Sequence, residues 1–296
     1  MELYRAYFRI LRHRLRGVIL YVVIVVGIVI IMTIQIPQMQ AFYANQMMNH
    51  YTDMWADYAG SMILKTKFLL YNRFDGENTN AIMLYSFLNY AAFSIFSITT
   101  AGIAMMLAEF QNKDISKRIK ITPITSARLT CSLMSASGIF AFFVWFMHVL
   151  AVIGLMGKQI LTIREILLAV NILALTIAAM GFAFLFTRFL GKQGKSGIIV
   201  PILTLLICFV SGIFTPQIVL SDAAKTIAVF TPTYWYGRAN GLIGEYFFVD
   251  FADYVEVARC MGIQLLFAVE MFIVAMAIDK HREKDNRSRL QIGRQR

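Results

Sequence analysis

The stretch ILLAVNILALTIAAMGFAFLFT, residues 166–187, contains no charged residue and is 22 residues long. A membrane-spanning helix needs roughly 20 predominantly apolar residues, so this stretch alone predicts a transmembrane helix. Five further stretches of similar length and composition occur at residues 17–36, 81–108, 129–157, 197–221 and 260–278. The sequence therefore predicts an all-α integral membrane protein with six transmembrane helices.

The basic residues outside these spans predict the orientation of the chain in the membrane. Five lie before residue 17, five between the second and third spans, three between the fourth and fifth, and seven in the tail 279–296. These segments share one side and hold 20 of the 28 basic residues. Since Lys and Arg in short loops resist translocation, we expect both termini in the cytoplasm and the segments 37–80 and 222–259 outside. The net charge of +11 is then a topology signal, and no nucleic-acid partner is expected.

No extramembrane segment is long enough to form a nucleotide-binding domain. The loop GKQGKS, residues 191–196, ends like a phosphate loop, but Phe189 stands where that motif needs its first glycine. A membrane-embedded enzyme would need paired acids or a Ser/His set, and the spans offer only Glu270 and His148. We therefore expect no catalytic residue, no metal and no cofactor bound by this chain.

Residues 1–16 have the pattern of a helix that lies in the membrane interface. Tyr4, Phe8, Leu11 and Leu15 recur at helical spacing beside a stripe of arginines. Such an amphipathic helix places its apolar face in the acyl boundary and would enter the first span at an elbow. The alternative is an arginine cluster that serves only to set topology.

The cytoplasmic loop 109–125 predicts a short basic helix at the membrane surface. Pro123 ends any helix that begins near Asn112, because the residue before a proline is disfavoured in the helical region. Ile115 and Ile119 then share one helical face, and Thr125 can cap the third span. A solvated basic loop is the equal alternative.

The segment between the fifth and sixth spans is too apolar, and too often broken by Pro and Gly, for a water-exposed loop. It begins with SGIFTP at residues 211–216 and continues through Thr231-Pro232 to three aromatic residues at 234–236. This pattern predicts two short re-entrant half-helices within residues 212–245. Such a geometry is tolerated only where protein covers the broken backbone.

Two ionisable residues lie within the predicted spans. Glu270 is near the middle of the sixth span, where a charge costs on the order of 3 kcal/mol on insertion scales unless it is protonated or paired. One interpretation places it in the bundle interior, in contact with substrate or relaying a helix movement; the other gives it a structural hydrogen bond to a polar residue on another helix. His148 is interpreted as a satisfied packing residue.

At these residues the chain resembles the permease subunits of type-2 ABC transporters, over essentially its whole length. The shared features are the interfacial helix 1–16, a permease domain 17–296 with six spans, the loop from Glu109 to Pro123, and the re-entrant region with its SGIFTP stretch. The loop lacks the glycine that often follows the glutamate in this family; Phe110 stands there.

The resemblance implies a subunit of an exporter in a prokaryotic plasma membrane. It would carry an amphipathic substrate such as a drug, an antimicrobial peptide or a lipid-like molecule. Its partners would be membrane lipid, a second permease (a copy of itself or a relative), and a separate cytoplasmic ATPase in two copies that binds ATP and Mg. A non-transporting sensor or immunity protein on the same scaffold is the alternative.

The resemblance also assigns roles to residues. Coupling to the ATPase would involve Glu109, Ile115, Ser116, Ile119 and Pro123. The translocation path and its gate would involve Gly212, Phe214, Pro216, Pro232 and Glu270, with the two half-helices tilting apart to open the outer leaflet.

Overall fold

A computed structural model describes Ile19, Val23, Val26 and Gly27 and the ranges 79–110, 126–156, 163–190, 196–214, 221–244 and 251–294. Every regular element in these ranges is a helix, which agrees with the predicted all-α class. The interfacial segment 1–16, most of the span 17–36, nearly all of the outer segment 37–80 and nearly all of the loop 109–125 lie outside the described residues.

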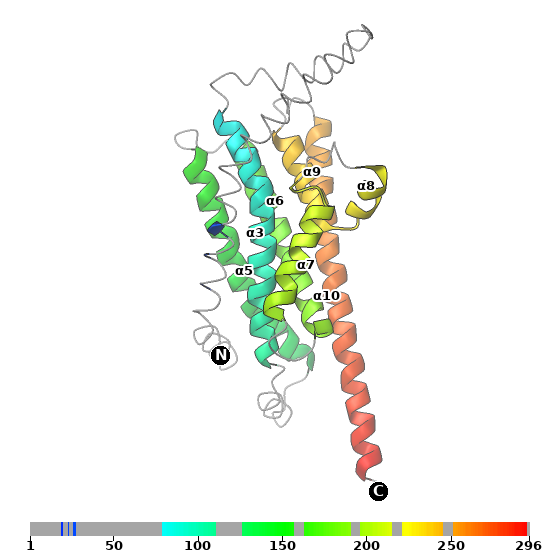
Figure 1. The fold of residues 1–296 in the computed structure, drawn as a ribbon. Coiled ribbons are helices and arrows are strands. Elements are labelled where there is room, and N and C mark those ends of the chain that lie inside the picture. The colour runs from blue at the N-terminus through cyan, green and yellow to red at the C-terminus, as the bar shows by residue number, and fades with distance from the viewer. Residues whose placement is uncertain are drawn as a thin grey trace.

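Seven helices carry the described fold (Figure 1). They are α3 (Thr79–Phe110), α5 (Ser126–Met156), α6 (Ile163–Leu190), α7 (Ser196–Val210), α8 (Asp222–Ala228), α9 (Pro232–Gly244) and α10 (Phe251–Arg294). The predicted spans 81–108, 129–157 and 166–187 match α3, α5 and α6 to within three residues at each end. Four of the described helices, α3, α5, α6 and α10, are long and apolar enough to cross a membrane.

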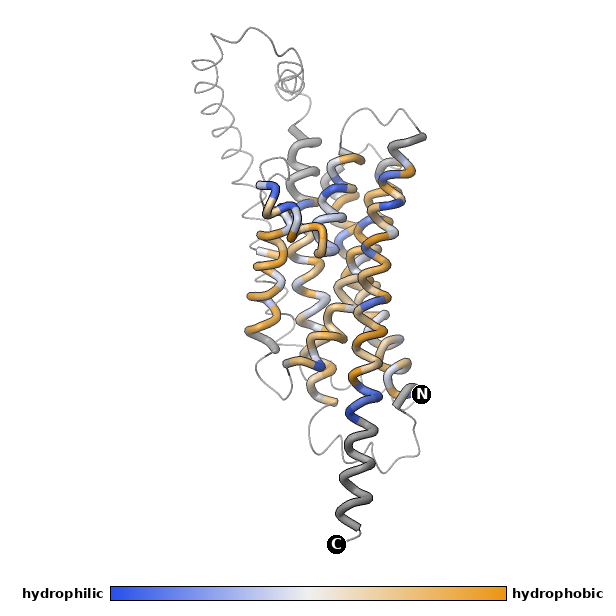
Figure 2. The backbone as a smooth tube through the Cα atoms, turned by 90° about the vertical axis from the view of Figure 1, so that its right-hand side faces the viewer, coloured by the Kyte–Doolittle hydropathy of each residue, from blue (hydrophilic) through white to orange (hydrophobic). Residues whose placement is uncertain are grey.

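The predicted helices 197–221 and 260–278 need correction. α7 ends at Val210, eleven residues early, because the chain turns at Ser211 and Gly212. α10 instead extends far past its apolar stretch and stays helical to Arg294, so most of the predicted tail 279–296 continues the helix. In Figure 2, apolar residues make up most of the length of the bundle, and hydrophilic residues gather toward its two ends.

α3 is the central helix of the bundle. It packs against α5, α6, α7 and α9, and its residues from Leu88 to Ala108 are almost all buried. Hydroxyl groups on α3 add polar contacts: Ser97 bonds Thr204 of α7 at 3.1 Å, and Thr100 donates to the Ala179 carbonyl of α6 at 3.3 Å. A displacement of α3 would therefore change its packing against all four of these helices.

α6 and α10 pack closely against each other at Gly181. A Cβ atom on Gly181 of α6 would lie 3.0 Å from the Ala268 carbonyl oxygen and 3.2 Å from the Ala268 Cα atom of α10. Because both are backbone atoms that cannot move aside, glycine is what permits this approach. The C-terminal ends of α3, α6 and α10 lie at one end of the bundle, and α8 and α9 lie toward the other (Figure 1).

Candidate functional site

The turn that ends α7 is a Schellman motif built on Gly212. The Gly212 N–H donates to the Phe209 carbonyl at 3.3 Å, and the Ile213 N–H donates to the Cys208 carbonyl at 3.2 Å. Gly212 has φ 76°, the left-handed conformation that this motif requires and that glycine adopts without steric cost. Ile213 and Cys208 are both buried, which supplies the apolar contact that usually accompanies the motif.

Phe214 fastens this turn to the central helix. Its ring lies 5.9 Å from that of Tyr90 and 5.7 Å from that of Phe93, both on α3, and 4.8 Å from that of Phe209 on α7. Aromatic pairs at these distances contribute beyond the burial of their area. Of the predicted gate residues, Phe214 thus lies against α3, and Gly212 forms the turn two residues before it. Pro216 lies outside the described residues.

Two short helices, α8 and α9, occupy the segment where re-entrant half-helices are predicted. Ser221 caps α8 by accepting the Ala224 N–H at 3.3 Å. Pro232, another predicted gate residue, is the first residue of α9, where the missing N–H of proline costs nothing. Thr231 precedes it and accepts the Tyr234 N–H at 3.4 Å. The depth of these helices in the lipid stays a prediction.

A buried network of amide side chains joins α9 to α6 and α10. Asn171 of α6 donates to the side-chain oxygen of Asn240 at 2.9 Å and to the Tyr236 carbonyl at 3.2 Å, and it accepts from Gln264 of α10 at 2.9 Å. The Tyr236 hydroxyl donates to the Leu88 carbonyl of α3 at 3.0 Å. The side chains of all three amides and of Tyr236 are fully buried.

Sequence reasoning missed this network, although the sequence contains a signal for it. Asn171 and Gln264 are each the one amide side chain of a mostly apolar predicted span. Polar amides within spans form hydrogen bonds to neighbouring helices, because lipid offers no partner. Pairing the two would have predicted the contact between α6 and α10; nothing in the sequence indicates that Asn240 joins them.

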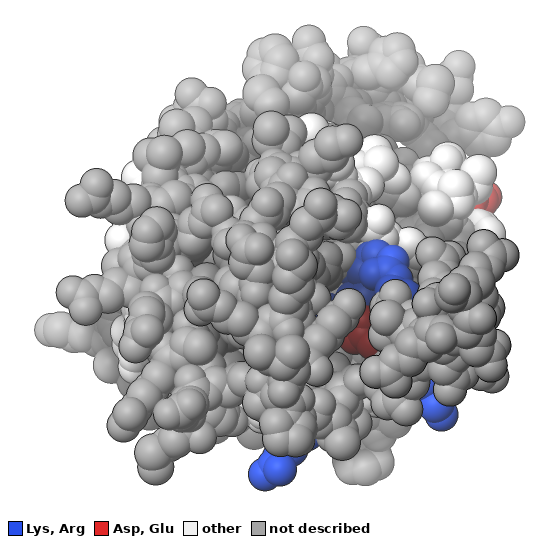
Figure 3. Space-filling view, turned by 90° about the horizontal axis from the view of Figure 1, so that it is seen from below, with Lys and Arg blue, Asp and Glu red and all other residues white. Residues whose placement is uncertain are grey.

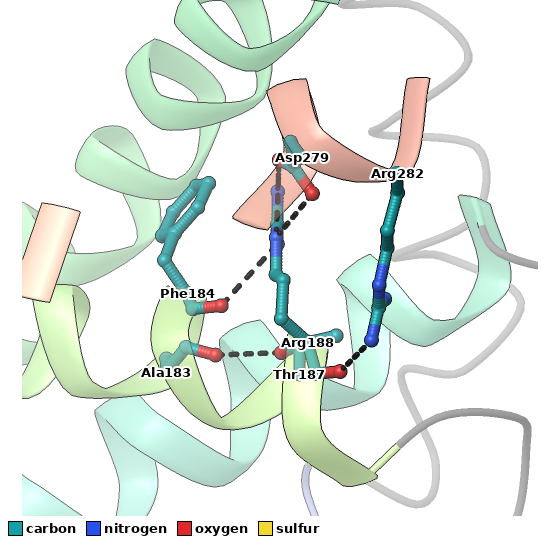
Figure 4. A network of polar contacts seen from close by, with 6 residues as sticks. All are labelled: Ala183, Phe184, Thr187, Arg188, Asp279 and Arg282. Atoms are coloured by element: carbon teal, nitrogen blue, oxygen red, sulfur yellow. Dashed lines mark hydrogen bonds and ion pairs between the residues drawn. The ribbon is translucent and has the colours of Figure 1, made fainter. Parts of the chain in front are cut away.

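The opposite end of the bundle holds a buried arginine (Figure 4). Arg188 near the end of α6 donates from Nε and Nη2 to the carboxylate of Asp279 on α10, with a shortest distance of 2.7 Å. Arg282 of α10 donates to the Arg188 carbonyl at 2.7 Å. Figure 3 views this end and shows basic and acidic surface side by side among the described residues. The pair locks α6 to α10 where both helices leave the apolar zone; the sequence had placed Arg188 in a loop.

Comparison with known protein families identifies the family of this chain. A family model described as "ABC-2 family transporter protein" matches residues 27–277, which is most of the chain. The chain belongs to the ABC-2 transporter family. Membrane subunits of ABC-2 transporters are generally not catalytic and normally work with an ATPase subunit, so this chain is a multi-pass membrane protein with a permease role. No curated protein and no solved structure matches the chain.

The coupling residues of this ABC-2 chain are described only in part. Glu109 lies in the last turn of α3, which ends at Phe110, and α5 begins at Ser126. Ile115, Ser116, Ile119 and Pro123 lie outside the described residues. The loop 109–125 therefore joins the end of the central helix to the start of α5.

The two intramembrane ionisable residues of the permease have different surroundings. His148 is buried and bonds the Ser94 hydroxyl at 2.7 Å and the Val144 carbonyl at 2.8 Å, which confirms its interpretation as a packing residue. Glu270 is exposed on α10 in the single chain, so the described residues do not enclose it in the bundle interior. Among the described residues Glu270 has no hydrogen-bonding or ionic partner.

Proposed function

We propose that this chain is the permease subunit of an ABC exporter that moves an amphipathic substrate across a prokaryotic plasma membrane. A separate cytoplasmic ATPase, in two copies, would bind ATP and Mg and supply the free energy. Membership of the ABC-2 family supports the permease role, and the position of α3 supports the route of coupling.

α3 connects the cytoplasmic loop 109–125, where the ATPase would bind, to the turn at Gly212 near the outer end of the bundle. It ends at Phe110, where the loop 109–125 begins, and its residues Tyr90 and Phe93 contact Phe214 of the outer turn. The helix rises by about 30 Å from Tyr90 to Phe110, which equals the thickness of the hydrocarbon core. A push on the loop by the closing ATPase would therefore reach the Gly212 turn through one rigid helix.

The substrate would pass between two copies of the permease. α7 presents an uncovered apolar face in the single chain, made of Ile202, Leu206 and Phe209 with 61%, 57% and 52% of their surface exposed. This face leads directly to the Gly212 turn at the end of the helix. Two such faces opposite one another would form an apolar path closed at its outer end by that turn.

Reconstitution with and without the ATPase tests the proposal. Vesicles that contain permease and ATPase should hydrolyse ATP and expel a fluorescent amphiphile, whereas the permease alone should do neither. A photo-crosslinker at Ser116 should capture the ATPase, and one on the exposed α5 residue Phe143, far from that loop, should not. ATP hydrolysis by the permease alone would contradict the proposal, and ATP hydrolysis by the complex without any efflux would favour the sensor alternative.

A further inference from the structure

Glu270 lies on an exposed apolar face of α10. Its exposed neighbours along this face include Leu266, Val269 and Ile273, with 61%, 52% and 56% of their surface uncovered. Successive residues on an α-helix are rotated by about 100°. Glu270 is therefore directly opposite Met261, which is buried in the bundle, and it points away from the other described helices.

Glu270 lies near the middle of the uncharged part of α10. Apart from Glu270 itself, residues Cys260 to Ile278 of α10 carry no charge, within the candidate span Tyr254–Arg282. Glu270 lies about 15 Å of helix from Cys260 and about 12 Å from Ile278. A glutamate side chain is too short to reach either interface, unlike the long side chains of Lys and Arg near helix ends.

An ionised Glu270 needs a partner from outside the described residues, because an unpaired carboxyl group at this depth is otherwise protonated. Acidic residues within spans almost always pair or face a protein interior, and Glu270 does neither among the described residues. The predicted span 17–36 contains no basic residue that could serve. A second copy docked symmetrically on this face would bring two carboxylates together, which is unfavourable.

We propose that this face of α10 binds the cationic head of an amphipathic substrate from the surrounding lipid, before the substrate enters the path along α7. The apolar tail lies along Leu266, Val269 and Ile273, while Glu270 offsets the charge of the head. A cation that crosses the membrane meets its largest desolvation cost near the centre, which is where Glu270 stands. Because this assignment rests on the proposed exporter function, it narrows the substrate class from amphiphiles in general to cationic amphiphiles.

Binding of two probes with the same alkyl chain tests the assignment. Dodecyltrimethylammonium and dodecyl sulfate, each below its solubilising concentration, would be titrated onto the permease–ATPase complex in lipid nanodiscs. Glu270→Gln should weaken binding of the ammonium probe by about tenfold, which corresponds to 1.4 kcal/mol, and leave the sulfate probe unchanged. Glu270→Asp keeps the charge and should retain the preference for the cation. The matched control Ile273→Gln adds an amide to the same face and should leave the difference between the probes intact.

Efflux separates failure of this inference from failure of the exporter function. If the wild-type complex expels the ammonium probe and Glu270→Gln does so equally well and binds it equally well, the inference is overturned while the exporter stands. If the wild-type complex binds the cation in a Glu270-dependent way but expels neither probe, the exporter function fails and the binding face stands. Equal binding of both probes by the wild type would also overturn the inference.

Discussion

The two short helices between α7 and α10 differ in how the bundle holds them. α9 buries Tyr236, Ala239, Asn240 and Ile243 and lies against α3, α6 and α10. α8 buries only Ala228, and its main neighbour among the described helices is α7. The sequence predicts a pair of similar half-helices, yet α9 belongs to the core and α8 lies on its surface.

This difference indicates which part of the outer end can move. Two hydrogen bonds tie the C-terminal end of α8 to the start of α9: the Trp235 indole N–H donates to the Val229 carbonyl at 2.8 Å, and the Thr231 hydroxyl donates to the Ala228 carbonyl at 2.6 Å. The other polar contacts of α8 are local: Ser221 caps its first turn, and Thr226 bonds the Asp222 carbonyl of the same helix at 2.9 Å. They survive if α8 moves as a unit. Displacing α9 would instead separate Asn240 from Asn171 and leave buried amides without partners, which is costly in an apolar surrounding. We therefore expect α8 and the Gly212 turn to open the outer end while α9 stays in place, rather than both half-helices tilting apart.

The largest effect is expected at the network that holds α9. Asn171→Ala removes three hydrogen bonds, and at the typical strength of such bonds in membranes the free energy of unfolding should fall by about 2 kcal/mol. Hydrogen exchange at the backbone amides of α9 should become faster as well. The control Thr226→Ala on exposed α8 should leave both quantities unchanged. Unaltered exchange in α9 of the Asn171 variant would show that these hydrogen bonds do not hold α9 in the core.

The sequence predicted the helical class and three spans because long runs of apolar residues have one stable arrangement in a membrane. It also indicated the short helices through Pro232 and the glycine at 212. The end of α7 at Val210 was missed because Ile213 and Phe214 are as apolar as the helix before them, so the predicted span was continued past Gly212 to residue 221.

Side-chain partners were harder to predict than helices. The pair of Arg188 with Asp279 joins residues 91 positions apart, and Asn171 bonds Asn240 across 69 positions. Hydropathy reports only that such residues are polar; their partners depend on how the helices pack. Glu270 shows the same limit, because nothing in its span distinguishes the buried face of α10 from the exposed one.

An intermediate effect is expected at the turn itself. A non-glycine residue in the left-handed conformation costs about 1–2 kcal/mol, and Asn tolerates it better than most. The free energy of unfolding should fall by roughly 1 kcal/mol in Gly212→Ala, by more in Gly212→Val and by least in Gly212→Asn. Substrate efflux should follow the same order in vesicles that contain the ATPase. Equal behaviour of the three variants would show that the φ of Gly212 is unimportant for the turn.

The smallest effect is expected in α8. Ser221→Ala removes the cap of a seven-residue surface helix and should destabilise that helix by about 1 kcal/mol. Because α8 contributes little to the core, denaturant unfolding of the whole protein should be unchanged, and only the amides of residues 222–228 should exchange faster. A lower global stability would mean that α8 is as firmly integrated as α9.

Distances between spin labels test the central claim most directly, namely that a separate ATPase drives opening at the turn and α8. Labels at Thr226 on α8 and at Gly241 on α9 would each be paired with one at Ile166, an exposed residue near the start of α6. When a non-hydrolysable ATP analogue is added to the permease–ATPase complex, the α8 distance should shift and the α9 distance should stay constant. The permease alone should show no shift. Equal movement of both labels, or a shift without the ATPase, would contradict this account.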